Sequence, residues 1–532
     1  MKKRIVASLL SVAMIATLAV GCAGPAKEGK TNQGGEEVKN EVSKVENETQ
    51  EQNKSDMITY PIVSIPTKIW ANGGSISENV VSKPAYDSLA VPTSDGYEYY
   101  LADTIELKDD NLTYSIHIRD NANWSDGTPI TSGDMKFTKD YYENILGYDY
   151  GEFNEIDDKT FELKVGEKPR ASFIANFLAY FTPLPSKPFE NDYTKVDDSD
   201  YFAKPEMITS GPYTVSEINE DHIIFKARDD YYAGKPSVET VVAKVIPTEE
   251  AQQVAFENGE LSFYKVTVND VLETYKNNDK YTIYEMDDAV LNYIQIKKKL
   301  PDDAREAICL ALDNKEIIDV VFGSETFASP ANSYMTPAHT SYNADTRYSV
   351  NLDRAKKLAK DSGLEGQTLT FIYNIDRQGA EGVATVAQQQ LAKIGVTLKL
   401  EGLESGTFFE RMWPQAYGIE NPEPWDLGYN QQEAMAGTGN VFLVDYTTPG
   451  SMWGEWGFSK KVVDMVAQAE AAPSIEESDK LYYNVQPLIN AEHLGYPVAY
   501  TKQVIVSQSN VKGIDAVAPY SGPGDFSKLI IE

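Results

Sequence analysis

The chain has 532 residues, a formal net charge of −33 and 42% hydrophobic residues. This length exceeds what one hydrophobic core supports, and it predicts two or three domains. The excess of acidic residues argues against nucleic acid as a partner, because nucleic-acid binding depends on clustered Lys and Arg.

The N-terminal segment has the order of a secretory signal. A basic triplet at residues 2–4 precedes an apolar stretch from Ile5 to Val20. This stretch is shorter than the roughly 20 residues that cross a bilayer. Residues 1–21 are therefore predicted to be a cleaved signal peptide.

Cys22 follows Ala19-Val20-Gly21, which resembles a bacterial lipobox. The resemblance implies that the cysteine is acylated and becomes the mature N-terminus, although Ala19 stands where Leu is usual. Residues 23–56 contain no aromatic residue and are rich in Glu, Asn, Gln, Lys and Gly. Such a composition does not bury enough apolar surface to fold. Residues 22–56 are thus predicted to form a lipidated, disordered tether that holds the body outside the cytoplasmic membrane.

The sequence contains two cysteines, Cys22 and Cys309, so no intramolecular disulfide can form once Cys22 is acylated. Cys309 lies in the apolar run Ala307–Ala311 and is predicted to be a small buried side chain.

The first half of the body has the pattern of an α/β protein. Alternating apolar residues predict a strand over 114–119, and Thr131 with Asp134 predicts the start of a helix that continues to Leu146. Later segments predict a hairpin over 213–218 and 223–228, a strand over 238–246, and a helix over 249–258 that ends at Gly259.

From about residue 301 the pattern changes to longer helices that alternate with single strands. One helix is predicted over 304–322, and a strand–helix–strand unit over 369–373, 382–394 and 396–400 predicts a parallel pair. A capping box at Ser474 starts a helix that reaches toward Glu492, and a last strand is predicted over 496–506.

Catalytic and cofactor motifs do not occur in the sequence. None of the four His stands in an H-E-x-x-H arrangement, and the sequence contains no G-x-S-x-G motif and no phosphate-binding glycine loop. Asp197, Asp198 and Asp200 lack the later Glu and central Gly of a calcium loop. We therefore expect no enzymatic activity, no cofactor and no metal. One alternative stays open, since 81 acidic residues could place two carboxylates face to face as in a glycoside hydrolase.

Four segments together resemble extracellular solute-binding proteins of family 5, the oligopeptide-binding lipoproteins of ABC importers. The clearest is residues 114–137, similar to the signature W-x-D-G-x-P-hydrophobic-T-x-x-D. The others are Gly211-Pro212-Tyr213 with the segment 228–236, the segment 305–313, and the segment 391–396. We expect the first signature to stabilise the fold without touching a ligand.

The resemblance implies an α/β, two-lobed periplasmic-binding-protein-like fold of type II with an extra third subdomain. The two lobes would be joined by crossing strands and would close on a ligand. The implied division is lobe I from residues 57–85, 206–288 and 498–532, an extra subdomain over 86–205, and lobe II over 289–497.

One segment departs from the pattern of the peptide-binding members. Trp425-Asp426 begins it, but Gln432 and Met435 stand where those members have a Trp and an Asp that pairs with the peptide's amino group. Either Glu433 takes that role, or the ligand carries no free amine there. We favour the second interpretation.

The sequence thus predicts a lipid-anchored substrate-binding protein, a monomer, that captures a peptide or peptide-like solute and delivers it to ABC permease subunits. A ligand-sensing receptor without import is a further alternative. The candidate ligand-binding residues are Trp70, Asn72, Tyr429, Asn430, Gln432, Glu433, Trp453 and Trp456.

Overall fold

The computed structural model describes the folded body with short gaps. The described residues are 56–70, 80–93, 96–346, 348–377, 379–433, 441–448, 456–517 and 524–532. The predicted signal peptide, Cys22 and the predicted tether up to residue 55 lie outside the described residues. Within those ranges we find no helix with the length and apolar character of a membrane span.

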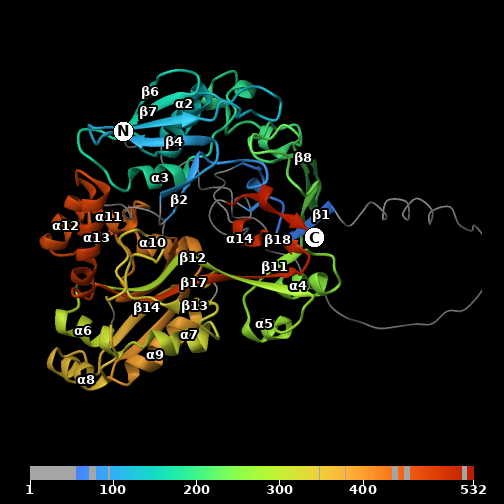
Figure 1. Ribbon diagram of the computed structural model, residues 1–532. Helices are drawn as coiled ribbons and strands as arrows, with labels where there is room; N and C mark the ends of the chain where they lie inside the picture. Colours follow the sequence, from blue (N-terminus) through green and yellow to red (C-terminus); the bar gives the residue numbers. More distant parts are fainter. Residues whose placement is uncertain are drawn as a thin grey trace, which may run out of the picture. The chain divides into compact units, whose positions relative to one another are not determined.

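A four-stranded mixed sheet contains the first strand of the body (Figure 1). Its order is β1 (Met57–Ile62), β10 (Thr240–Val245), β9 (His222–Ala227) and β8 (Tyr213–Ile218). β1 runs parallel to β10, whereas β8 and β9 form an antiparallel hairpin. Helix α4 (Glu249–Glu257) follows, and Gly259 beyond it has a φ of +74°. The hairpin, the strand and the helix predicted over 213–258 are confirmed.

A second sheet is formed within residues 102–164. Its order is β4 (Ala102–Leu107), β5 (Thr113–Ile118), β7 (Thr160–Lys164) and β6 (Glu152–Glu155). Helix α2 (Ser132–Tyr141) begins as predicted, and its last turn widens into a π-helical turn over Tyr142–Leu146. The Asp134 carboxylate accepts the Thr131 backbone N–H at 3.0 Å and the indole N–H of buried Trp124 at 3.2 Å. These signature residues therefore stabilise the fold, as expected.

Shorter elements complete this part of the chain. They are the hairpin β2 (Ala90–Thr93) and β3 (Gly96–Tyr99), helices α3 (Phe173–Tyr180), α5 (Asn269–Tyr275) and α14 (Ile514–Val517), and the pair β18 (Val511–Lys512) and β19 (Ile530–Ile531).

A seven-stranded sheet carries the crossing strands. Its order is β11 (Phe263–Val266), β17 (Gly495–Gln508), β12 (Tyr281–Ile296), β16 (Leu427–Glu433), β14 (Thr368–Asn374) and β15 (Thr397–Leu403), with β13 (Ala328–Pro330) also paired to β17. One end of β17 pairs with β11, and its other half pairs with β13. The long strands β12 and β17 pair along almost their whole length and so pass from one lobe into the other (Figure 1).

Helices cover both faces of the β14–β16 part of this sheet. One group comprises α6 (Asp302–Ala311), α7 (Asn314–Val321), α8 (Leu352–Asp361) and α9 (Ala380–Ala392), and the other α10 (Ser405–Met412), α11 (Val441–Thr447), α12 (Lys460–Glu470) and α13 (Ile475–Asn490). Phe371 and Tyr373 pack with the first group, whereas Ile372 packs with the second, as alternation along a strand requires. β14 and β15 are parallel and flank α9, which confirms the predicted unit.

The single helix predicted over 304–322 is wrong. The chain forms α6 and α7 instead, and Leu312 between them is extended, with φ −80° and ψ 134°. The Asp313 carboxylate accepts the backbone N–H groups of Lys315 and Glu316 and so caps α7. Cys309 on α6 is buried as predicted, and burial raises the pKa of its thiol.

The buried apolar residues fall into separate clusters. The largest combines residues between Ile58 and Phe263 with Ile505 and residues between Val511 and Leu529. Two others consist of residues between Leu291 and Tyr500. This separation agrees with two lobes, and the boundaries that the sequence predicts for the lobes and the extra subdomain remain a proposal.

Candidate ligand-binding site

The end of β16 lies where the crossing strands change register. β12 has an irregularity between Asp287 and Val290, and Glu433, the last residue of β16, pairs with Val290. Asn430 and Gln432 lie on one face of β16, and Tyr429 lies on the other. The strand thus presents polar side chains at the junction of the two lobes.

A chain of hydrogen bonds connects two of these side chains with two tyrosines. The Asn430 amide nitrogen donates to the hydroxyl oxygen of Tyr293 on β12 at 3.1 Å. The hydroxyls of Tyr293 and Tyr446 lie 3.0 Å apart, and the Tyr446 hydroxyl donates to the amide oxygen of Gln432. We call these four side chains the Asn430–Gln432 relay. Asn430, Tyr293 and Tyr446 are buried, whereas Gln432 is partly exposed.

Burial keeps both phenols of the relay protonated. It raises the pKa of Tyr293 to about 12, although the hydrogen bonds with Tyr446 and Asn430 act in the opposite direction. It also raises the pKa of Tyr446 well above its usual value, with a further contribution from Tyr293. At neutral pH each hydroxyl therefore carries one hydrogen to donate.

Aromatic rings pack around the relay. Trp456 stacks on Tyr446 with ring centroids 4.6 Å apart, and it contacts Tyr293 and Tyr334 at 5.5 Å each. The indole nitrogen of Trp456 and the amide oxygen of Asn430 are buried, and neither has a hydrogen-bond partner within the part of the chain that the structure describes. The cluster therefore leaves one buried donor and one buried acceptor unsatisfied, which is costly in a closed core.

Tyr429 belongs to a different core. Its hydroxyl donates to the Asn292 amide oxygen at 2.6 Å and accepts from the Gln431 amide at 3.2 Å. Its ring packs with the cluster on the α6–α9 face. This side chain holds β16 against β12 and does not join the relay.

The structure separates Trp70 from the other predicted site residues. Trp70 is buried and packs against Tyr141 and Phe202, with ring centroids 5.5 Å away in both cases. Asn72 and Trp453 lie outside the described residues, and for Glu433 the backbone alone is described. Of the eight predicted residues, the structure brings together Asn430, Gln432 and Trp456.

Sequence reasoning missed Tyr293, Tyr334 and Tyr446. The chain contains 33 Tyr, so composition does not distinguish these three. Tyr293 and Tyr446 are 153 positions apart in the chain. β12 pairs with β16 and so positions Tyr293 opposite Asn430. A prediction of this strand pairing would have pointed to Tyr293.

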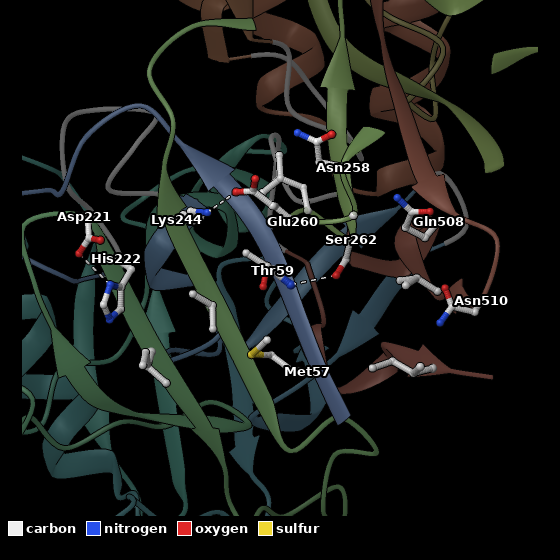
Figure 2. A pocket seen from close by; sticks show the side chains of 16 residues that line it. Met57, Thr59, Asp221, His222, Lys244, Asn258, Glu260, Ser262, Gln508 and Asn510 are labelled. Carbon is white, nitrogen blue, oxygen red and sulfur yellow. Dashed lines mark hydrogen bonds and ion pairs between the residues drawn. The ribbon is translucent and has the colours of Figure 1, made fainter. Parts of the chain in front are cut away.

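A groove of about 590 Å³ lies elsewhere in the body, along β1, β9 and β10 (Figure 2). Its lining residues are Met57, Thr59, Asp221, His222, Ile224, Val242, Lys244, Asn258, Gly259, Glu260, Leu261, Ser262, Gln508, Asn510, Val511 and Ile531. Lys244 pairs with Glu260 at 2.7 Å, and His222 pairs with Asp221 at 2.8 Å. These polar groups satisfy one another, and none of the site residues predicted from the sequence lines the groove.

The described residues include no group of three or more His, Cys, Asp or Glu side chains placed to hold a metal ion. The side chains of the relay and of Trp456 are neutral amides, phenols and an indole, which bind a ligand by hydrogen bonds and stacking.

Two long strands that join two lobes, with polar and aromatic side chains at their junction, define a two-lobed solute-binding protein. Residues 96–448 match the family model for bacterial extracellular solute-binding proteins, family 5. The chain belongs to this family, whose members are extracytoplasmic binding proteins and not enzymes. The predicted family and fold are confirmed.

Known relatives agree with this assignment. The chain is 27% identical over 362 residues to the oligopeptide-binding protein AppA of Bacillus subtilis, a match that covers 62% of this chain and 63% of that protein. It is 23% identical over 478 residues to the dipeptide-binding protein of Escherichia coli, covering 81% of this chain and 86% of the relative. Among solved structures it resembles the ABC transporter substrate-binding protein CtaP of Listeria monocytogenes, with a TM-score of 0.80, 23% identity and coverage of 89% and 99% of the two chains.

Proposed function

We propose that this protein is the lipid-anchored substrate-binding protein of an ABC importer and that it captures a peptide or peptide-like solute. The relatives in Bacillus subtilis and Escherichia coli carry oligopeptide- and dipeptide-binding names, which supports a peptide ligand. Family membership supports delivery to ABC permease subunits.

The unsatisfied pair of atoms beside the relay carries this proposal. Asn430 offers a buried acceptor and Trp456 a buried donor, and both side chains contact Tyr293. A peptide unit has one N–H donor and one C=O acceptor, so it complements both atoms.

Binding is tested by thermal shift and native mass spectrometry of the purified protein against peptides of two to nine residues. A ligand that binds the native state raises the unfolding midpoint, and the stabilisation grows with the logarithm of its concentration over its Kd. We expect several peptide lengths to stabilise the protein, and monosaccharides and free amino acids to leave the midpoint unchanged. If no peptide bound or raised the unfolding midpoint, the peptide part of the proposal would be contradicted.

Acylation of Cys22 is tested in cells with an alkyne fatty acid. We expect the wild-type protein to carry the label and to stay in the membrane fraction, and Cys22→Ser to lose both properties. Cys309→Ser is the matched control, because Cys309 is the other cysteine of the chain and its side chain is buried. Label on the Cys22→Ser variant would refute the anchor.

A further inference from the structure

We infer that the Gln432 side chain donates a hydrogen bond to an acceptor group of the ligand, because the relay uses its amide oxygen and leaves its amide N–H groups to donate. The acceptor is a peptide carbonyl or a C-terminal carboxylate, and not a free ammonium group. This inference rests on the proposed peptide-binding function and names the group that one end of the site selects.

The direction of the relay follows from counting hydrogens. A tyrosine hydroxyl has a single hydrogen. Tyr446 gives its hydrogen to the Gln432 amide oxygen, so the hydroxyl contact with Tyr293 requires Tyr293 to be the donor there. Tyr293 then has a lone pair available for the Asn430 amide N–H, which it accepts at 3.1 Å. Each hydrogen bond of the relay is thus donated in the direction of Gln432.

A reversed relay, with both amides turned over, would also connect the four groups. It would make the Asn430 amide oxygen the acceptor and put the amide N–H groups where the amide oxygen now has no partner among the described residues, at a position that is 3% exposed. Orphaned buried N–H donors are rarer in proteins than carbonyl oxygens that lack a partner. The observed direction is therefore the one with the lower cost.

The surroundings hold this direction in place. Tyr293 is fully buried, and Tyr446 is covered by the stacked ring of Trp456. Gln432 is the member of the relay that is partly exposed, at the point where β16 ends beside the irregularity of β12. A neutral donor that is fixed in this way favours an acceptor, and it cannot compensate the charge of a buried ammonium as a carboxylate would.

The inference is tested with one peptide sequence in four forms, in which the N-terminus is free or acetylated and the C-terminus is free or amidated. Calorimetry with the wild-type protein should give affinities for the acetylated and free-amine forms within about threefold of each other. Gln432→Glu replaces the donor with an acceptor of the same size, and we expect it to bind the acetylated forms at least tenfold more weakly while it retains the free-amine forms. Comparison of the amidated and free-acid forms then identifies which acceptor is read.

Gln431→Glu is the matched control, because the Gln431 amide donates to Tyr429 on the other face of the strand. Its preference among the four peptides should equal that of the wild type. Tyr446→Phe removes the hydrogen that fixes the Gln432 amide oxygen, so the preference should shrink while the unfolding midpoint shows whether the fold is kept. An unchanged preference in Gln432→Glu, or a wild-type protein that requires the free amine, would overturn the inference.

A measurement without ligand separates this inference from the proposed function. The side-chain amide resonances of Gln432, assigned by their absence in Gln432→Glu, should show no close proton contact with the Tyr446 hydroxyl edge. A strong nuclear Overhauser effect between those amide protons and the Tyr446 ring would indicate the reversed relay and overturn the inference. If no peptide form binds, the proposed function fails, and this spectrum still decides the orientation of Gln432.

Discussion

The carboxylate of Glu470 accepts two hydrogen bonds from Ser172, which lies 298 positions earlier in the chain. The Ser172 hydroxyl donates at 2.7 Å and its backbone N–H at 3.4 Å. The Ala171 backbone N–H also donates to the Glu470 carbonyl oxygen at 3.0 Å, and the Tyr482 hydroxyl donates to the other carboxylate oxygen. Ser172 directly precedes α3, where a negative charge is favourable. Since Ser172 lies in the predicted extra subdomain and Glu470 in the predicted lobe II, the contact joins the two.

Glu470→Gln is expected to weaken ligand binding, because it removes the charge from a contact between segments that must stay together around a ligand. A charge-assisted hydrogen bond that is partly exposed contributes on the order of 1 kcal/mol. We therefore expect a Kd about fivefold higher by calorimetry with a peptide that the wild type binds. Glu250→Gln, at an exposed glutamate on α4, is the control. Equal affinities for all three proteins would show that the contact does not contribute to the bound state.

Asp87 is expected to make stability depend on pH in the neutral range. The carboxyl is buried, and burial raises its pKa to about 7, against the hydrogen bonds that Tyr232 and Tyr231 donate at 2.8 Å each. Between about pH 4 and pH 7 the unfolded chain releases this proton while the native protein keeps it, so stability falls as pH rises through this window.

The Asp87→Asn substitution should remove this dependence. The amide oxygen still accepts from the tyrosine hydroxyls, but no charge forms. We expect the variant to gain stability relative to the wild type between pH 5 and pH 8, by at most roughly 4 kcal/mol for the full window. Urea unfolding at both pH values measures this difference. Asp279→Asn, at an exposed aspartate, is the control, and its unfolding free energy should change between pH 5 and pH 8 as much as that of the wild type. An equal change in Asp87→Asn would refute the role of Asp87.

Gly211→Ala is expected to destabilise the body. A Cβ atom at Gly211 would lie 2.7 Å from the Ala85 carbonyl carbon and 2.8 Å from the Tyr86 backbone nitrogen. Backbone atoms cannot move away by a rotamer change as a side chain can. We therefore expect the free energy of unfolding to fall by about 1–3 kcal/mol, measured by urea unfolding.

Gly406→Ala is the control for that measurement. Gly406 lies in α10, and a Cβ atom there would have no neighbour within 4 Å. Alanine also favours a helix over glycine by roughly 1 kcal/mol, so this variant should be as stable as the wild type or more stable. A Gly211→Ala protein that is equally stable would show that residues 84–86 can move away.

Local sequence determined those elements whose start and end signals are contained in a few residues. The helix that begins after Ser474 forms because the Ser474 side chain accepts the Glu477 backbone N–H. The parallel strands β14 and β15 flank a helix that ends before Gly395, whose φ is +77°. Such signals act over one turn, so they can be read without knowledge of the tertiary structure.

The break between α6 and α7 needed a distant residue. Residues 304–322 contain no Gly or Pro that would interrupt a helix. The Gln390 amide on α9 pairs with Asp313, accepting its backbone N–H at 3.0 Å and donating to its carbonyl oxygen at 3.1 Å. This contact satisfies backbone groups that a continuous helix would have used itself. Its 77-residue separation hides it from a local pattern.

By itself the sequence determined the family resemblance and the presence of Gln432 in place of an aromatic residue. The direction in which the Gln432 amide points was decided by tertiary structure, because the Tyr446 hydroxyl donates to its oxygen and the Tyr293 hydroxyl in turn donates to Tyr446. A hydrogen bond needs its two groups within about 3 Å, and the packing of α11 against β12 brings these residues to that distance.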